Sequence, residues 1–97
     1  MRVITLGTLR EFWEKYPDAQ QALKAWYDDA ERGNWQTPAE IKEIYASASV
    51  LPNNRVIFNI RGNHYRLVVK IHYNTGFIFV RFIGTHREYD RIDANTI

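Results

Sequence analysis

The spacing of apolar residues changes near the middle of this chain. Up to about residue 45, apolar residues recur every three or four positions, as on one side of an α-helix. From Arg55 onward they recur at every second position, as on one face of a β-strand. A helical half followed by a sheet half predicts an α+β fold, in which a helical hairpin packs on one face of a small antiparallel sheet of three or four strands.

The helical half is predicted to begin with a short strand over Val3–Leu6. In the segment that follows, Thr8 and Glu11 have the spacing of a capping box, in which a hydroxyl and a carboxylate bind free N–H groups of the first helical turn. This pattern predicts the start of the first helix. The apolar side of that helix has four members at helical spacing: Leu9, Phe12, Trp13 and Tyr16.

A second helix completes the predicted hairpin. Pro17 interrupts the first helix, Asp18 and Gln21 start the next one, and Gly33 supplies its C-terminal stop. The apolar side of this helix consists of Ala22, Leu23, Trp26 and Ala30.

A third, shorter helix is predicted before the sheet. Thr37 can cap it, and Pro38 occupies the first helical position, where the missing N–H of proline is harmless. The helix continues through Tyr45, and residues 46–54 have the composition of a loop.

The sheet half opens with a hairpin. A strand over Arg55–Ile60 is followed by a turn over residues 61–64, in which Gly62 or Asn63 can adopt the positive φ of a tight turn. The next strand, Tyr65–Tyr73, is apolar or aromatic at every odd position. One of its faces therefore belongs to the core and the other is cationic, because three even positions are basic: Arg66, Lys70 and His72.

The last predicted strand, Phe77–Ile83, is apolar at both odd and even positions, which is typical of a central strand covered on both faces. Its exception is Arg81. A guanidinium among aromatic side chains loses solvation unless it is paired or directed at a bound anion. Two interpretations of Arg81 remain open: an ion pair with Asp90 or Glu88, and a contact with the phosphate of a ligand.

Length and composition limit the possible classes of protein. Ninety-seven residues, 45% of them apolar, fit a single domain spanning residues 1–97. The absence of cysteine excludes disulfides, thiolate metal sites and a cysteine nucleophile. The sequence has no signal-peptide pattern and no apolar run of the roughly 20 residues that a membrane helix needs. We therefore expect a cytoplasmic protein without a membrane partner.

The net charge of +2 conceals an asymmetry between the two halves. Residues 1–50 carry six basic and eight acidic side chains, whereas residues 51–97 carry seven basic and three acidic ones, together with all three histidines. A cationic half suits a polyanionic ligand, because contacts of Lys and Arg with phosphates release counterions. A basic surface that binds nothing would show the same balance, so charge alone leaves nucleic-acid binding open.

His86 and Tyr89 follow the last strand three positions apart, so one helical turn would place them on the same side. Cleavage of RNA by its own 2′-hydroxyl needs a group that transfers protons near neutral pH, such as imidazole, and cations that stabilise the phosphate. A packing pair or a capping interaction at these two positions is the alternative. The histidines lack the spacing of metal ligands, so neither a metal site nor another cofactor is expected.

Two blocks of the second half resemble the HigB family of toxins. Residues 61–73 contain Gly-Asn-x-x-Arg-Leu-x-x-Lys, and residues 79–90 contain Arg-Phe-x-Gly-Thr-His-x-x-Tyr-Asp. The similarity is close from Arg55 to Ile97. In the helical half it is mainly one of layout, with local matches at Glu14–Pro17 and Pro38–Lys42.

The resemblance implies a RelE-like fold and activity as a ribosome-dependent messenger RNA interferase. It also implies a partner, a helix-turn-helix antitoxin of the HigA type. Carried onto this chain, it implies RNA-binding roles for Arg61, Asn63, His64 and Arg66, and catalytic roles for Lys70, Arg81, His86 and Tyr89. In this assignment His86 is the general acid or base and Arg81 the main stabiliser of phosphate charge, with Lys70 as second stabiliser or base, Arg66 as a phosphate contact and Tyr89 as an orienting group.

Three hypotheses follow for function. The first is cleavage of messenger RNA in the ribosomal A site by attack of the 2′-hydroxyl. The second is a non-catalytic module that binds RNA or the ribosome through the same basic face and blocks translation. The third is a purely structural partner subunit, which would be supported by an Arg81 buried in an ion pair.

Overall fold

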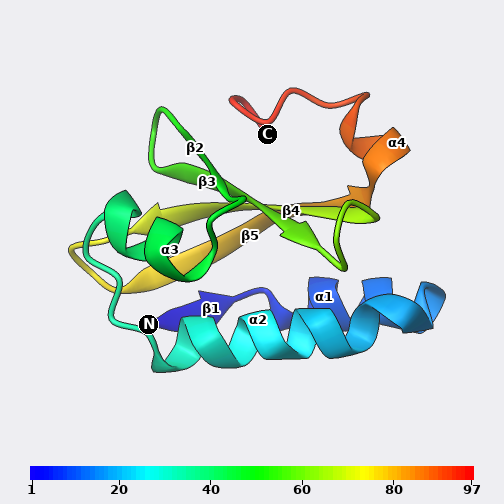
Figure 1. The fold of residues 1–97 in the computed structure, drawn as a ribbon, viewed down its shortest axis with the longest axis horizontal. Helices are drawn as coiled ribbons and strands as arrows, with labels where there is room; N and C mark the ends of the chain where they lie inside the picture. Colours follow the sequence, from blue (N-terminus) through cyan, green and yellow to red (C-terminus); the bar gives the residue numbers. More distant parts are fainter.

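The computed structural model describes all 97 residues and confirms the predicted α+β class (Figure 1). Its sheet contains five strands in the spatial order β1-β5-β4-β3-β2. Neighbouring strands are antiparallel except for β1, which runs parallel to β5, so the sheet is mixed and larger than expected. The strands are β1 (Arg2–Ile4), β2 (Ser49–Leu51), β3 (Arg55–Ile60), β4 (Tyr65–His72) and β5 (Phe77–Thr85).

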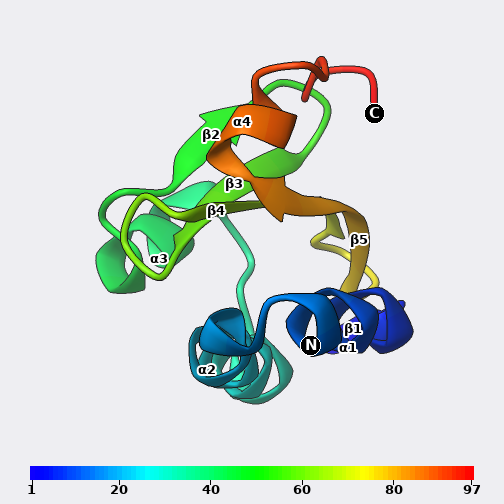
Figure 2. The ribbon, with the colours of Figure 1, turned by 90° about the vertical axis from the view of Figure 1, so that its right-hand side faces the viewer.

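The predicted helical hairpin consists of α1 (Leu6–Lys15) and α2 (Gln20–Arg32), joined by a 3-10 turn, η1 (Pro17–Ala19). Figure 2 shows these two helices side by side on one side of the sheet, whereas α4 (His86–Tyr89) and the C-terminal segment lie on the other. The remaining helix, α3 (Pro38–Ile44), begins where the sequence predicted. None of the helices combines the length and the apolar content needed to cross a membrane.

The core lies between the helical hairpin and the sheet. Nineteen buried residues form this larger cluster. Leu23 and Trp26 of α2 meet Phe58 of β3 and Leu67 of β4 there, and the ring centroids of Trp26 and Phe58 are 5.5 Å apart. Each large apolar side chain removed from water contributes about 1.5–3 kcal/mol, so this cluster is the main source of stability.

The first helix begins earlier than the capping pattern predicted. The strand β1 ends at Ile4, Thr5 adopts a left-handed conformation with φ 74°, and α1 starts at Leu6. Thr8 therefore lies inside the first turn, where its main-chain N–H donates to the oxygen of Thr5 (3.1 Å). The predicted helix start at Thr8 is wrong, because the chain leaves the sheet edge at Thr5 and turns at once into the helix.

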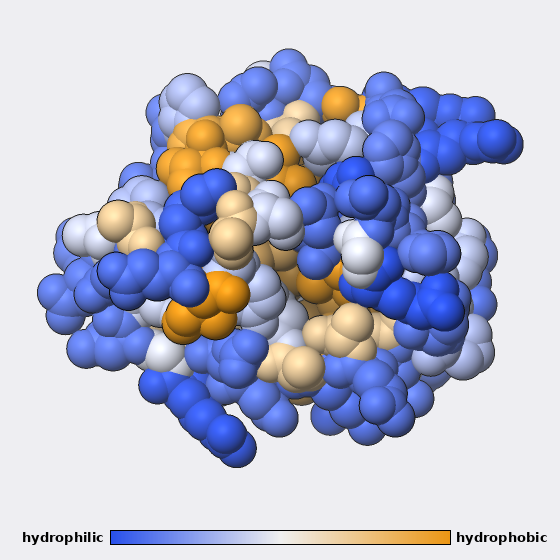
Figure 3. Space-filling model, viewed as in Figure 1, coloured by the Kyte–Doolittle hydropathy of each residue, from blue (hydrophilic) through white to orange (hydrophobic).

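Residues 46–54 are not all loop, because β2 pairs with β3 in antiparallel register, with Val50 opposite Val56. Three residues are too few to show a period-two pattern, so the sequence gives no signal for this edge strand. In the space-filling view, apolar side chains reach the surface in separate patches, including one over β2 and one over α3 (Figure 3). Ile44 and Val50 are the exposed large apolar side chains.

Candidate functional site

The cationic face predicted for β4 is present on the side of the sheet opposite α1 and α2. Leu67, Val69 and their odd-numbered neighbours are buried in the larger cluster, whereas Arg66 and Lys70 are only partly buried. These two side chains lie four residues apart on one strand, a spacing of roughly 13 Å. Across the sheet, Arg66 faces Asn59 of β3, and Lys70 faces Arg55.

Arg81 is the extra residue of a β-bulge. Val68 pairs with Phe82 and Val69 pairs with Val80, so Arg81 has no partner on β4. A bulge shifts the alternation of the strand by one residue, which is why β5 is apolar at both odd and even positions. The bulge places Arg81 level with the step between Val68 and Val69, about halfway between Arg66 and Lys70.

The structure contradicts one of the two interpretations of Arg81, the ion pair, and the phosphate contact stays a prediction. Its side chain is exposed rather than enclosed by aromatic residues, and it forms no ion pair with Asp90 or Glu88. Instead its Nε donates to the main-chain oxygen of Ile97 (3.2 Å). The strand it belongs to is covered fully on the helical side, where Ile78 is buried, and only partly on the other.

The cationic face is partly covered, because the segment after α4 packs on its centre. Ala94 is buried there against Ile57 and Val68, in a second cluster that is separate from the main core. Figure 1 shows this C-terminal segment, in red, on the far side of the sheet from α1 and α2. Residues 90–97 are mostly polar, so their composition does not predict this contact. The partly buried members of the second cluster are Leu51, Phe82, Tyr89, Ile92 and Ile97.

The β3–β4 turn and the start of α4 lie together at one end of the cationic face. The main-chain N–H of His86 donates to the oxygen of His64 (3.1 Å), and Arg66 donates through Nη1 to the oxygen of Asn63 (3.1 Å). Gly62 adopts positive φ, 64°, as predicted, and the other turn residue that does so is Arg61 rather than Asn63. The fold therefore gathers His64, Asn63, Arg66 and His86 in one place, although they come from two separate stretches of sequence.

His86 and Tyr89 occupy one helical turn, as predicted, but they have different neighbours. The Nδ1 atom of His86 lies 3.3 Å from the carboxylate of Asp90, and both side chains are more than half exposed. The ring of Tyr89 packs toward Phe82, with centroids 6.5 Å apart. His86 is thus held by a carboxylate at one ring nitrogen, while its Nε2 makes no hydrogen bond.

Two local features fix α4 at the end of β5. Thr85 and Glu88 form a capping box: the main-chain N–H of Glu88 donates to Oγ1 of Thr85 (3.1 Å), and the N–H of Thr85 donates to the Glu88 carboxylate (2.8 Å). Gly84 leaves room for the ring of Phe82, since a Cβ at this position would lie 2.5 Å from Cζ of that ring. The position of His86 is therefore set by the residues immediately around it.

Charge pairing separates the predicted site residues into two groups. Arg61 forms an ion pair with Asp18 of η1 (3.0 Å), so its side chain is directed toward the helical layer. Arg66, Lys70 and Arg81 form no ion pair. Three cations without carboxylate partners on one face leave a positive potential that suits a polyanion.

Comparison with known proteins agrees with this geometry. The model of a family described as HigB_toxin, the RelE-like toxic component of a toxin-antitoxin system, matches residues 19–92. The chain belongs to the HigB toxin family. It is therefore a RelE-like toxin that is paired with an antitoxin.

Curated relatives of this HigB-family chain match almost its whole length. It is 28% identical over 96 residues to a protein of Escherichia coli (strain K12) named "mRNA interferase toxin HigB", an alignment that covers 97% of this chain and 92% of that protein. It is 28% identical over the same length, with the same coverage, to "mRNA interferase HigB" of Shigella flexneri.

One functional candidate on this face of the HigB-family chain escaped the sequence analysis. Arg55 is the single charged residue that is buried, with 8% of its surface exposed. It opens β3 directly opposite Lys70, and its Nε and Nη2 both donate to the oxygen of Ile97. The sequence shows only an arginine at the start of a strand, which is an ordinary position for a solvated side chain.

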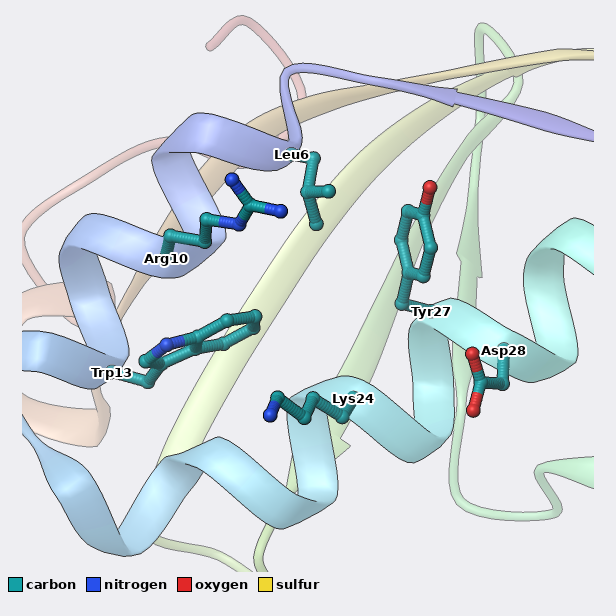
Figure 4. A pocket seen from close by; sticks show the side chains of 6 residues that line it. All are labelled: Leu6, Arg10, Trp13, Lys24, Tyr27 and Asp28. Atoms are coloured by element: carbon teal, nitrogen blue, oxygen red, sulfur yellow. The ribbon is translucent and has the colours of Figure 1, made fainter.

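A hollow in the surface of this toxin lies elsewhere, between α1 and α2 (Figure 4). The side chains of Trp13 and Lys24 face each other across it, with Nζ of Lys24 5.6 Å from the ring centroid. None of the predicted site residues reaches this hollow. It is lined by Leu6, Arg10, Trp13, Lys24, Tyr27 and Asp28.

Three tyrosines on the helical side of the sheet have raised pKa values. Burial, with the hydrogen bond to Asp18 and its negative charge, raises the pKa of Tyr65 to about 12. Burial and the hydrogen bond to Asp29 also raise the pKa of Tyr45, and burial alone raises that of Tyr73. These tyrosines stay protonated at neutral pH and belong to the packing of the core.

Proposed function

We propose that this single domain, residues 1–97, is the toxin that cleaves messenger RNA on the ribosome and so stops translation. The observation that carries the proposal is the row of cations without carboxylate partners, Arg66, Arg81 and Lys70, which leads to His86 at one end of the face. Phosphates of a single strand repeat along such a row, and the scissile phosphate would lie between the guanidinium of Arg81 and the imidazole. The names of the curated relatives support RNA as the substrate.

The proposed reaction begins with attack of the RNA 2′-hydroxyl on the adjacent phosphate. The 2′-oxygen loses its proton, a bond to phosphorus forms, and the bond to the 5′-oxygen breaks as that oxygen gains a proton. The products are a 2′,3′-cyclic phosphate and a 5′-hydroxyl. His86 serves as general acid or base through Nε2, because Asp90 orients the ring at Nδ1.

The charges in the site take the remaining roles. Arg81, freed from strand pairing by the bulge, stabilises the negative charge on the pentavalent phosphate, and Lys70 is a second stabiliser or base. Arg66 holds a neighbouring phosphate, and Asn63 and His64 contact the same stretch of RNA at the turn. Tyr89 orients the substrate from the edge of the second cluster.

The proposal extends to the antitoxin that binds the cationic face and to the place in the cell where the toxin acts. We propose a helix-turn-helix antitoxin of the HigA type, with acidic residues that complement the cationic half of this chain and speed association. Both partners act in the cytoplasm, without contact with a membrane, because the ribosome is the place of cleavage.

The decisive experiment adds purified protein to a translating bacterial extract and maps RNA ends by primer extension. The wild-type chain should produce discrete new ends in translated messenger RNA and none in naked messenger RNA. Arg81→Ala should lose this activity, whereas Arg32→Ala, at the exposed end of α2, should keep it. Arrest of protein synthesis with intact RNA would instead establish the non-catalytic, ribosome-binding alternative, and no effect on synthesis would contradict both functions.

A further inference from the structure

Two histidines from separate parts of the chain lie side by side at one end of the cationic face. The main-chain N–H of His86 donates to the oxygen of His64 (3.1 Å). Tyr65 pairs with Thr85 in the antiparallel register of β4 and β5, so His64 and His86 lie opposite each other one step beyond the ladder. Opposite residues of antiparallel strands have Cα atoms about 4.5–5.5 Å apart. This spacing allows both imidazole rings to contact one phosphodiester.

Both histidines belong to the cationic side of the sheet. Side chains alternate along a strand, so His64 shares the side of Arg66, whereas the buried Tyr65 shares the other. The hydroxyl of Tyr65 accordingly donates to Asp18 in the helical layer. The helix α4, which begins with His86, lies on the side opposite that layer (Figure 2). Both imidazoles are exposed and thus open to a ligand on this face.

The hydrogen bond at Nδ1 determines which nitrogen of His64 is free. Nδ1 lies 2.9 Å from the main-chain oxygen of Arg61. A carbonyl oxygen only accepts, so Nδ1 carries the proton of the neutral ring and Nε2 keeps its lone pair. His64 thus presents a proton acceptor to solvent, which is the state that a general base requires.

The ring of His86 has a charged partner instead. Its Nδ1 lies 3.3 Å from the carboxylate of Asp90, and a negative charge beside an imidazole stabilises the ring with both nitrogens protonated. Beside His64 the nearby unpaired charge is positive, because Arg66 donates through Nη1 to the oxygen of Asn63 (3.1 Å) and forms no ion pair. The surroundings of the two rings therefore differ as those of an acid and a base do.

The other charges near the two rings do not reverse this difference. Arg61 is neutralised by its ion pair with Asp18 (3.0 Å), and Glu88 is engaged in the cap of α4. Arg87 follows His86 directly, and neighbouring positions of a helix do not face each other.

We propose that His64 is the general base and His86 the general acid of RNA cleavage. The 2′-hydroxyl gives its proton to Nε2 of His64 as its oxygen bonds to phosphorus. The bond from phosphorus to the 5′-oxygen breaks, and that oxygen takes the proton from Nε2 of His86. Proton exchange with water then resets both exposed rings. The inference rests on the proposed function, and it adds a catalytic role for His64 and divides the two proton transfers between two rings.

The test uses purified ribosomes programmed with a short messenger RNA whose cleavage site has been mapped by primer extension. The scissile linkage carries either its normal 5′-oxygen or a sulfur atom in that place. A thiolate leaves without a proton, so the sulfur substrate needs a base but no acid. Single-turnover rates are measured at saturating toxin, which separates the chemical step from binding.

The two histidines should respond differently to the sulfur atom. His64→Gln should lower the rate about 10²- to 10³-fold on both substrates. His86→Gln should lower it about 10²- to 10⁴-fold on the oxygen substrate and by less than about 10-fold on the sulfur substrate. Asp90→Asn should show a smaller loss, on the oxygen substrate alone. The matched control is His72→Gln, at the exposed end of β4, which should cleave both substrates at the wild-type rate.

A further measurement separates proton transfer by His64 from a structural role. Imidazole added in solution should restore part of the cleavage by His64→Ala, because it can enter the space of the missing ring and accept the proton. The Tm of each variant shows whether it is folded. A loss on both substrates that imidazole does not restore would assign His64 to structure or RNA binding and overturn the proposal.

The remaining outcomes distinguish this inference from the proposed function. Full activity of His64→Gln, or a loss on the oxygen substrate alone, would overturn its role as the base. A loss by His86→Gln that persists on the sulfur substrate would overturn its role as the acid. Either result, with cleavage by the wild-type chain, leaves the nuclease in place. The absence of cleavage by the wild-type chain would refute the nuclease and this inference together.

Discussion

The two faces of the sheet differ in how much apolar surface they bury and in whether their charges are paired. On the side of α1 and α2, nineteen buried residues form one cluster, and Arg61 and Asp18 form an ion pair at its edge. On the other side only Ile57, Val68 and Ala94 are buried in the cluster, and the cations around them have no carboxylate partners. The first face holds the molecule together. The second carries Arg66, Lys70 and Arg81 without ion pairs and is covered at its centre by the segment that contains Ala94.

The largest expected difference between the faces concerns cleavage. His86→Gln should lower the rate of cleavage about 10²- to 10⁴-fold without changing Tm, because it removes the proton-transfer group and leaves the core untouched. The matched control is His72→Gln, at the exposed far end of β4, which should cleave normally. A fully active His86→Gln protein in the primer-extension assay would remove this residue from the mechanism.

The next difference concerns stability. Leu67→Ala empties a fully buried position on the helical side and should cost about 3–5 kcal/mol in the free energy of unfolding. Ile57→Ala, in the small cluster on the other side, should cost less, about 2–3 kcal/mol, because the C-terminal segment can move into the space. Urea denaturation of both variants measures the two values. Equal losses would show that the two faces are packed with the same rigidity.

The helical side should also weaken at high pH. The pKa of Tyr65 is raised from 10.0 to about 12 in the folded chain, so the folded state holds the phenolic proton more tightly than the unfolded state. The stabilisation is therefore complete below pH 10 and is lost as the pH rises through 12. Between pH 10 and pH 12 the free energy of unfolding of Tyr65→Phe should therefore fall less than that of the wild type. Denaturation curves of both proteins at pH 9 and pH 11.5 measure this difference. Identical decreases in the free energy of unfolding of the two proteins would contradict the prediction.

The smallest expected effects come from two helix caps, one at the start of α3 and one at the start of α4. Glu40 accepts a hydrogen bond from the N–H of Thr37 at the start of α3, and Glu88 does the same for Thr85 at α4. Replacing either glutamate by alanine should cost about 0.5–1 kcal/mol. Thermal melts measure this cost. Cleavage should fall only in Glu88→Ala, because that cap positions His86, and a similar fall in Glu40→Ala would indicate a general loss of folding.

The parts of the fold that the sequence predicted are those governed by local periodicity. The helical stripe of Leu9 and Phe12, the stop at Gly33 and the alternation along β4 all depend on residues within one element. Errors arose where a short segment depends on a distant partner. The start of α1 follows from the turn at Thr5, and β2 forms because β3 offers it a pairing edge.

The candidate site shows the same division. The sequence by itself determined the residue types, the cationic face of β4 and the proximity of His86 to Tyr89 along one helical turn, since spacing along a chain fixes these. It also carried the motifs of the HigB family. Only the tertiary structure decided that a bulge releases Arg81 and that Arg55 and Arg81 meet at Ile97. The physical reason is that these contacts join residues up to 42 positions apart, and strand register rather than local pattern brings such residues together.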